Sequence, residues 1–250
     1  HFSHPDLNII SQSSPTGTQY LQAVGAAFAL QKKNNNSVVY VSSGEGTTSQ
    51  GDFHEALNWA SREKAPVVFH IENNNYAISV PIEEQISGGS VYNITSGYDS
   101  LSRYDIDGCN FFESMMAFDK AFERTRNGKG PSLIISNVVR LLPHSSSDDH
   151  NKYRDLKEIE SDIKRDPLTM FRGECIKKYK INIKELNQID SSTDEELEKK
   201  LSWALEQEDP TADSYKDNLF SNNWSELKIV DFSYISEKIV MVDAINHALS

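Results

Sequence analysis

The strongest constraint on the fold is the alternation of two β-branched runs with one helical pattern between residues 37 and 71. Residues 37–43 (SVVYVSS) and 66–71 (PVVFHI) have the composition of strands buried on both faces. Residues 52–62 between them carry apolar side chains at helical spacing. A strand, a helix and a strand within about 35 residues predict a right-handed parallel crossover.

The same alternation continues through the first 140 residues. Residues 18–33 (TQYLQAVGAAFALQKK) predict a helix for which Thr18 is the N-cap. Residues 111–126 repeat the helical pattern, and residues 132–139 (SLIISNVV) predict another buried strand. We therefore expect an α/β fold with a doubly wound parallel sheet.

The second half of the chain has a different composition. Residues 144–150 (HSSSDDH) predict a polar loop, and the chain after Tyr153 is rich in Lys and Glu without a buried-strand pattern. A capping box at Thr193 and Glu196 predicts the start of an amphipathic helix. Its expected inward residues are Leu197, Leu201, Ala204 and Leu205. With a last helical pattern at residues 241–249, these features predict a mostly helical C-terminal extension.

Charge and cysteine content exclude several classes of protein. Acidic residues number 37 and basic residues 25, so the net charge is 25 − 37 = −12, which disfavours nucleic acid and anionic membranes as partners. No apolar run approaches the roughly 18 to 20 residues of a membrane span. Two cysteines, Cys109 and Cys175, form neither a disulfide framework nor a metal knuckle, which favours a reducing compartment. The chain begins at His1, which indicates a boundary within a longer protein.

Two turns follow the first two predicted strands. Gly44-Glu45-Gly46 follows the first strand, and Asn73-Asn74 follows the second. Because parallel strands end at the same edge of a sheet, these turns should meet there, where doubly wound folds bind ligands. Glycines let backbone N–H groups approach an anion, and carboxylate and amide oxygens suit Mg²⁺, so the pair predicts a metal–diphosphate site.

Taken alone, a Gly-x-Gly turn has other interpretations. It is common as a structural turn or as part of a nucleotide site. A dinucleotide site needs a third glycine, however, and Ser49 stands at that position. The asparagine pair, 73 − 46 = 27 and 74 − 46 = 28 residues after Gly46, favours the metal–diphosphate interpretation.

This pairing resembles the diphosphate signature of thiamine-diphosphate enzymes, Gly-Asp-Gly followed by Asn-Asn. Residues 44–81 and 10–29 resemble the alpha subunit of the thiamine-dependent 2-oxo acid dehydrogenases, a resemblance that extends over residues 8–170. The branched-chain type is most similar, because Glu lies between the glycines and HSSSDD precedes Tyr153-Arg154. Residues 239–249 (IVMVDAINHAL) resemble the start of the partner beta subunit and suggest a fused alpha–beta polypeptide.

The resemblance assigns roles to individual residues. Glu45, the Asn74 side chain and the Tyr76 carbonyl match Mg²⁺ ligands, and His144 matches the active-site histidine of a flexible loop. The residues matched to thiamine diphosphate are Ser14 and Thr16 at the aminopyrimidine, and Gly44, Gly46, Thr47 and Arg140 at or near the diphosphate. A K⁺ site is matched by Ser13, Pro15, Thr18 and Gln19.

The implied activity is oxidative decarboxylation of a branched-chain 2-oxo acid with acyl transfer to a lipoyl group on a transacylase. A beta subunit or fused beta domain would supply the glutamate that activates the cofactor, so the chain alone should be inactive. The implied assembly is a homodimer or resembles a heterotetramer, in the cytoplasm or, in a eukaryote, the mitochondrial matrix. The implied domains are a cofactor-binding domain (1–170), a helical extension and connector (171–235) and a truncated beta-type start (236–250).

Two alternatives remain open at this stage. One is a non-catalytic or degenerate alpha-type subunit that serves assembly, because Glu72 replaces a basic residue that the family often has beside the asparagine pair. The other is a pyruvate or acetoin dehydrogenase alpha subunit. We also expect Asn75, which replaces a frequent glycine, to tolerate positive φ, and His54 and His70 to be structural.

Overall fold

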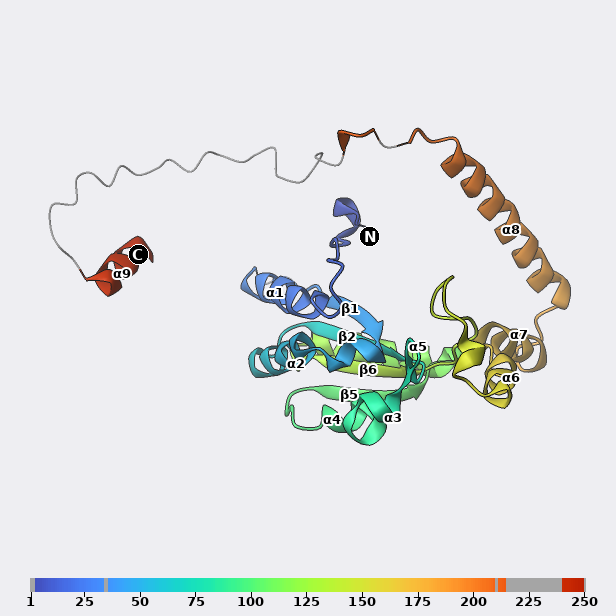
Figure 1. Cartoon of the computed structure of the whole chain (residues 1–250), viewed down its shortest axis with the longest axis horizontal. Helices are drawn as coiled ribbons and strands as arrows, with labels where there is room; N and C mark the ends of the chain where they lie inside the picture. Colours follow the sequence, from blue (N-terminus) through green and yellow to red (C-terminus); the bar gives the residue numbers. More distant parts are fainter. Residues whose placement is uncertain (1–2, 34–35, 210, 215–239, 250) are drawn as a thin grey trace. The chain divides into compact units, whose positions relative to one another are not determined.

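The computed structural model describes residues 3–33, 36–209, 211–214 and 240–249 (Figure 1). The chain divides into two compact units, residues 1–189 and 190–250, which are described separately. The first unit contains every strand of the described residues. None of the helices in the described part of the chain is long and apolar enough to cross a membrane.

A four-stranded parallel sheet forms the centre of the first unit. Its order is β1-β2-β6-β5, which Figure 1 shows from top to bottom. The strands are β1 (Val39–Gly44), β2 (Val67–Asn73), β5 (Ser102–Asp107) and β6 (Ser132–Asn137). The parallel order confirms the expected α/β class, and β2 and β6 are buried as predicted.

The prediction that β1 is buried on both faces is wrong. β1 lies at an edge of the described sheet, and only Val41 within it is buried. Tyr40 remains 47% exposed. The β-branched composition of residues 37–43 indicates a strand but carries no information about how many neighbouring elements cover it.

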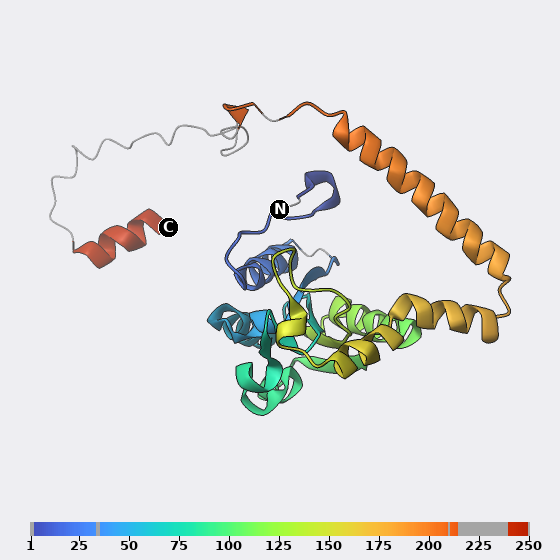
Figure 2. The same cartoon turned by 45° about the vertical axis from the view of Figure 1, so that its right-hand side comes forward.

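Helices cover both faces of the sheet. α1 (Gln19–Lys32) and α2 (Gly51–Glu63) pack on one face, where Phe69 of β2 joins their core cluster. α5 (Phe111–Arg126) packs on the other face against Val68 of the same strand (Figure 2). Because alternate side chains of β2 enter different clusters, the sheet is doubly wound, as expected.

Several short elements and one strand were not predicted. β5 was missed because its sequence, SRYDID, has four polar side chains in six and lacks the apolar run of a buried strand. The short elements are η1 (Pro5–Leu7), η2 (Glu45–Ser49), β3 (Tyr76–Ala77), β4 (Val80–Pro81), α3 (Ile82–Gln85), η3 (Ser87–Gly89), α4 (Val91–Ile94) and η4 (His150–Lys152). Among them, η2 contains Glu45 and Gly46 of the first predicted turn, and β3 begins two residues after Asn74 of the second.

The helical extension is confirmed, but one boundary is corrected. The described helices after the sheet are α6 (Leu156–Lys164), α7 (Pro167–Lys177), α8 (Ile183–Leu205) and α9 (Met241–Leu249). α8 begins ten residues before Thr193, so the capping box does not start a helix, and Leu197, Leu201 and Leu205 are exposed rather than inward. Residues 215–239, which include part of the predicted connector and of the beta-like stretch, lie outside the described residues.

Candidate functional site

The two predicted turns meet at the carboxyl edge of the sheet. The strands before them are in register, with Gly44 opposite Glu72. The glycine turn (residues 44–49) and the asparagine turn (residues 73–78) are joined by a hydrogen bond of 3.1 Å from the Asn74 N–H to Glu45 Oε2. The structure therefore brings the Glu45 carboxylate to the backbone of the asparagine turn.

Glu45 is the buried acid of this site. Its side chain is 1% exposed, and Oε1 is buried without a hydrogen-bond partner among the described residues. Burial raises the pKa of the carboxyl group, and neighbouring backbone N–H groups and the charge of Arg140 oppose that rise. A buried carboxylate oxygen without a partner is costly, so this position favours either a proton or a cation.

The glycine turn is held tightly on its other side. Gln85 Nε2 donates to the Gly46 carbonyl at 2.8 Å, and Thr48 Oγ1 donates to the Glu45 carbonyl at 2.7 Å. A Cβ atom on Gly46 would lie 2.9 Å from Cβ of Ala77, so this position requires glycine. Thr47 is buried and Gly44 is exposed, so only part of the turn faces solvent.

The asparagine turn uses its side chains to hold its own backbone. Asn73 Oδ1 accepts from the Asn75 N–H at 3.1 Å, and Asn74 Oδ1 accepts from the Tyr76 N–H at 3.0 Å. Asn75 has a φ of 68°, as expected from its tolerance of this region. Ile78 has a φ of 58°, which is strained for a β-branched residue, and its side chain is 54% exposed.

Residues of the predicted K⁺ site lie together in the loop before α1. The Ser13 hydroxyl is hydrogen-bonded to the Thr18 hydroxyl, which donates to the Pro15 carbonyl at 3.0 Å. Gln19 Oε1 accepts from the Gly17 N–H at 3.0 Å. Thr18 occupies the N-cap position of α1 but its side chain makes no capping bond, so that prediction is wrong because the hydroxyl is used within the loop.

This loop packs against the end of the glycine turn. Gly17 has a φ of 99°, and a Cβ atom there would lie 2.9 Å from Cβ of Gln50 and 3.7 Å from Cγ2 of Thr47. The predicted aminopyrimidine residues Ser14 and Thr16 are exposed in the same loop. The predicted cofactor residues before α1 and after β1 are therefore neighbours.

Arg140 is buried at the base of the predicted active-site loop, here the Arg140 loop (residues 140–154). Its guanidinium is 7% exposed and donates to the Ile78 carbonyl and the Tyr153 hydroxyl. It also forms an ion pair of 2.9 Å with Asp148 Oδ2. The bond to Ile78 joins the Arg140 loop to the asparagine turn.

Asp148 collects the hydrogen bonds of this loop. Its Oδ2 accepts from the Tyr153 hydroxyl at 2.6 Å and from the His144 N–H at 2.8 Å. These hydrogen bonds, with the charge of Arg140, hold the pKa of the Asp148 carboxyl below its usual value. His144 is therefore fixed through its backbone, while its side chain is exposed.

A second buried arginine connects α6 to the same region. Arg154 donates to the Arg140 carbonyl at 2.8 Å and forms ion pairs with Glu158, at 2.8 Å, and Asp162. The Tyr76 hydroxyl donates to the other Glu158 oxygen at 2.9 Å. The asparagine turn, the Arg140 loop and α6 thus form one hydrogen-bonded network.

Comparison with known sequences decides the family. A family model described as "Dehydrogenase E1 component" matches residues 1–213. The chain belongs to this family. The resemblance predicted from residues 10–29 and 44–81 is confirmed.

Three relatives illustrate the match to the dehydrogenase E1 component. The 2-oxoisovalerate dehydrogenase subunit alpha of Bacillus subtilis is 40% identical over 173 residues, which cover 69% of this chain and 52% of the relative. The 3-methyl-2-oxobutanoate dehydrogenase subunit alpha of Mycobacterium tuberculosis is 39% identical over 160 residues, which cover 64% of this chain and 43% of the relative. The pyruvate dehydrogenase E1 component subunit alpha of Staphylococcus aureus is 38% identical over 169 residues, which cover 66% of this chain and 45% of the relative. The chain spans about half the length of these relatives.

Within this E1 chain, sequence reasoning missed several side chains that hold the site. Gln85, Thr48, Asp148 and Tyr153 carry no local signal, because each acts through a partner that the fold brings to it. The sequence shows an acidic residue, Asp148, after the predicted active-site histidine, but it does not show that Asp148 pairs with Arg140.

Two other predictions concern side chains beside the site. His70 is buried and hydrogen-bonded to the Tyr40 hydroxyl at 2.8 Å and to Ser136 Oγ at 2.9 Å, which confirms a structural role. Glu72, the unexpected acid beside the asparagine pair, is exposed and lies 3.9 Å from His70 Nδ1. In the described part of the chain no three His, Cys, Asp or Glu side chains gather as a metal site, so a cation at Glu45 would also need amide and carbonyl oxygens.

Proposed function

We propose that this chain forms the metal- and diphosphate-binding half of a thiamine-diphosphate-dependent 2-oxo acid dehydrogenase of the branched-chain type. The observation that carries the proposal is Glu45 at the meeting point of the two turns, whose buried Oε1 has no hydrogen-bond partner in the part of the chain that the structure describes. Family membership supports the choice of cofactor and reaction. The reaction is oxidative decarboxylation followed by acyl transfer to a lipoyl group on a transacylase.

The residues present suit a magnesium diphosphate. Mg²⁺ would be held by the Glu45 carboxylate, the Asn74 side chain and the Tyr76 carbonyl, which are oxygen ligands of the kind it prefers. Since an Mg²⁺ site supplied by one or two protein oxygens is usually completed by phosphate, the single carboxylate agrees with a cofactor-bound metal. Gly44, Gly46 and Thr47 would face the diphosphate, with the Arg140 charge nearby.

The loop before α1 would hold the other end of the cofactor. Ser14 and Thr16 would meet the aminopyrimidine through their backbone groups. Oxygens of Ser13, Pro15, Thr18 and Gln19 would bind K⁺, an assignment supported by the hydrogen bonds that already bring the first three together. The packing of Gly17 against Gln50 would transmit that order to the glycine turn.

Thiamine diphosphate, when bound, supplies the electron sink for decarboxylation. The role of this chain's own residues is to position the reacting groups. Arg140 and Asp148 fix the backbone of His144, and its exposed imidazole would donate a proton at the lipoyl sulfur.

The remaining elements of the activity lie in partners. A beta subunit or fused beta domain would supply the activating glutamate, so we expect the 250-residue chain alone to give no turnover. Measurable decarboxylation by the purified chain would contradict this, and activity restored by a separate beta chain would support it. Branched-chain substrates are favoured by the relatives at 40% and 39% identity, and pyruvate is the second candidate because of the relative at 38%.

The domain assignment, 1–170, 171–235 and 236–250, and the alpha–beta fusion remain predictions. We place the assembly, a homodimer or a heterotetramer-like complex, in the cytoplasm, or in the mitochondrial matrix of a eukaryote. The low cysteine content supports a reducing compartment.

Calorimetric titration with thiamine diphosphate tests the site directly. Binding should require Mg²⁺, and Asn74→Ala should weaken it by about 10-fold or more, because a ligand oxygen is lost. Glu72→Gln is the matched control, since this carboxylate is exposed two residues away, and it should leave the affinity unchanged or higher. Equal affinity with and without excess chelator, or an unchanged Asn74→Ala variant, would refute the assignment.

A further inference from the structure

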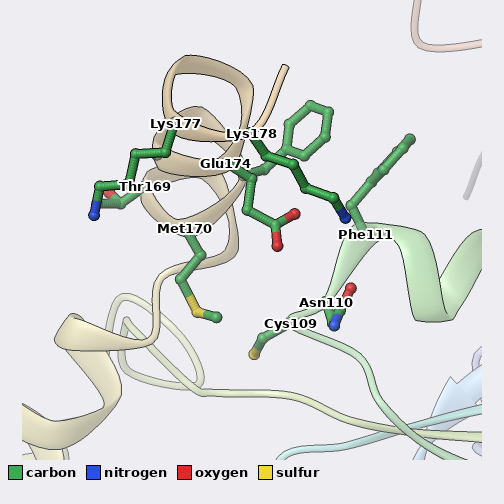
Figure 3. Close-up of a pocket in the computed structure, with 10 residues that line it drawn as sticks. Cys109, Asn110, Phe111, Thr169, Met170, Glu174, Lys177 and Lys178 are labelled. Atoms are coloured by element: carbon green, nitrogen blue, oxygen red, sulfur yellow. The ribbon is translucent and has the colours of Figure 1, made fainter. Parts of the chain in front are cut away.

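A cavity lies beyond the carboxyl end of β5. Its volume is about 330 Å³, and it is a partly open hollow between the start of α5 and α7 (Figure 3). The lining residues are Cys109, Asn110, Phe111, Thr169, Met170, Phe171, Gly173, Glu174, Lys177 and Lys178. β5 and β1 are the two outermost strands on opposite sides of the described sheet, so this cavity is separate from the glycine turn.

The wall of the cavity is apolar. Cys109 is buried, and the Phe111 and Phe171 rings lie 4.4 Å apart between centroids. Phe111 is 48% exposed and Met170 39% exposed, so their apolar surfaces are only partly covered by the protein. Concave apolar walls of this size, with a few polar groups, are typical of small-molecule sites, and 330 Å³ lies at the small end of their range.

Two opposite charges face this cavity without neutralising each other. Glu174 and Lys178 are four residues apart on one helical face, an order that usually favours an ion pair. Yet no ion pair joins them among the described residues, and the Glu174 carboxylate has no hydrogen bond there. The Lys178 ammonium lies instead 5.4 Å from the Phe112 ring centroid. Figure 3 shows both side chains reaching toward the start of α5, whereas Lys177 extends toward Thr169.

Asn110, at the start of α5, adds a donor to the lining of the cavity. Its Oδ1 already accepts from the Phe112 and Glu113 N–H groups, at 3.1 and 3.2 Å, as the cap of α5. Its Nδ2 group is therefore the part of the side chain left for a ligand. The cavity thus presents one acceptor, Glu174, and two donors, Lys178 and Asn110, beside an apolar wall.

We propose that this cavity binds a free α-amino acid with an apolar side chain. Its ammonium group would meet Glu174, and its carboxylate would meet Lys178 and Asn110. Its side chain would lie against Met170 and the Phe111–Phe171 pair. A simple anion would be repelled by Glu174 and a simple cation by Lys178, while an uncharged apolar ligand would leave the Glu174 carboxylate without a partner. This inference goes beyond the proposed function and does not depend on it.

Calorimetric titration of the intact protein with L-leucine tests the proposal. Saturable binding is expected. 4-Methylpentanoate, which lacks the ammonium group, and 3-methylbutylamine, which lacks the carboxylate, should each bind at least about 10-fold more weakly, because one charged hydrogen-bonding group is left without its partner. Glycine, which lacks the apolar group, should also bind more weakly. No binding of L-leucine, or binding of the three analogues as tight as that of L-leucine, would overturn the proposal.

Variants assign the binding to this cavity. Glu174→Gln and Lys178→Met should each weaken L-leucine binding by about 10-fold. Gly173→Leu should block it, since a Cβ atom there meets nothing within 4 Å and leucine suits a helix better than glycine. Glu160→Gln, an exposed carboxylate on α6, is the control and should bind normally. Thiamine diphosphate affinity should be the same in all four variants. Unchanged L-leucine binding in Glu174→Gln and Gly173→Leu would refute the site, whatever the outcome at Glu45.

Discussion

The glycine turn and the Arg140 loop lie beside each other but differ in whether their buried charges are paired. In the glycine turn, Glu45 is buried, and one of its carboxylate oxygens has no hydrogen-bond partner among the described residues. In the Arg140 loop, Arg140, Asp148 and Tyr153 satisfy one another within the protein. The first arrangement is incomplete without a bound cation or proton, whereas the second is complete and serves to hold a loop in place. Buried charge therefore indicates a ligand only where the protein leaves it unpaired.

The largest expected effect is at His144, where the completed loop presents its exposed imidazole. General acid or base groups contribute about 100-fold to 10,000-fold, so His144→Ala in the assembled enzyme should lower overall turnover by that order. Thiamine diphosphate affinity should not change, because the His144 contact with Asp148 uses the backbone N–H. Steady-state kinetics with lipoylated acceptor, together with calorimetry, measure both. Lost cofactor binding with normal turnover at saturating cofactor would assign His144 a structural role instead.

Glu45→Gln should have opposite effects on cofactor binding and on the stability of the ligand-free protein. Cofactor binding should be lost, because the charged metal ligand is removed. The ligand-free protein, in contrast, should become more stable at neutral pH by about 1 kcal/mol, since a buried unpaired carboxylate is replaced by a neutral amide. Thermal denaturation without cofactor measures this change, and a lower Tm for Glu45→Gln would contradict it.

The same residue gives a pH dependence with a defined sign. Burial raises the pKa of Glu45 above its unfolded value, so the folded protein binds the extra proton more readily. The stability of the ligand-free protein should therefore fall as pH rises through the interval between the unfolded and folded pKa values. Mg²⁺-dependent cofactor binding should change in the opposite direction, weakening as pH falls through the raised pKa. Parallel pH profiles of wild type and Glu45→Gln isolate both contributions.

Asp148→Asn should loosen the Arg140 loop without touching the glycine turn. Removing the charge leaves buried Arg140 without its ion-pair partner and weakens the hold on His144 and Tyr153. Limited proteolysis within residues 140–154 should be several-fold faster. Because the pKa of Asp148 is lowered in the folded protein, wild-type protection should be present at neutral pH and decrease as pH falls toward that pKa. Asp149→Asn, an exposed neighbour, is the control, and equal cleavage of both variants would contradict the network.

The smallest effect is expected at Asn75, where the asparagine turn requires positive φ. Asn75→Ala should destabilise the protein by about 1 kcal/mol, because alanine tolerates this region less well. Asn75→Gly should stay within about 0.5 kcal/mol of wild type, since relief of strain is offset by a more flexible unfolded chain. Denaturant titration distinguishes the two, and identical midpoints would show that φ at this position costs little.

Sequence reasoning identified what local pattern determines. The buried runs gave β2 and β6, helical spacing gave α1, α2 and α5, and the paired turns gave the contact between Glu45 and Asn74. What failed depends on distant neighbours. The composition of β1 does not reveal its edge position, and the polar residues of β5 conceal a strand that pairs with β6.

Two further failures have the same cause. The capping signal at Thr193 is overridden because the helix is already continuous from Ile183. The partners of Arg140 lie 8 and 13 residues further along the chain and 62 residues before it, at Asp148, Tyr153 and Ile78. Only the folded chain brings such groups together, so motif spacing found the groups proposed to bind the cofactor but not the groups that hold them.

Ile78 links the asparagine turn to the Arg140 loop through its backbone carbonyl. A β-branched residue at a φ of 58° stores about 1 to 3 kcal/mol, and the only bond described for its carbonyl is from Arg140. If Arg140 released that carbonyl, the peptide would relax to a more populated backbone conformation, and the asparagine turn would change with it. The bond from Arg140 thus helps to hold the asparagine turn in its present conformation. Loss of that bond would also change the oxygens that the turn offers to a metal ion at Glu45.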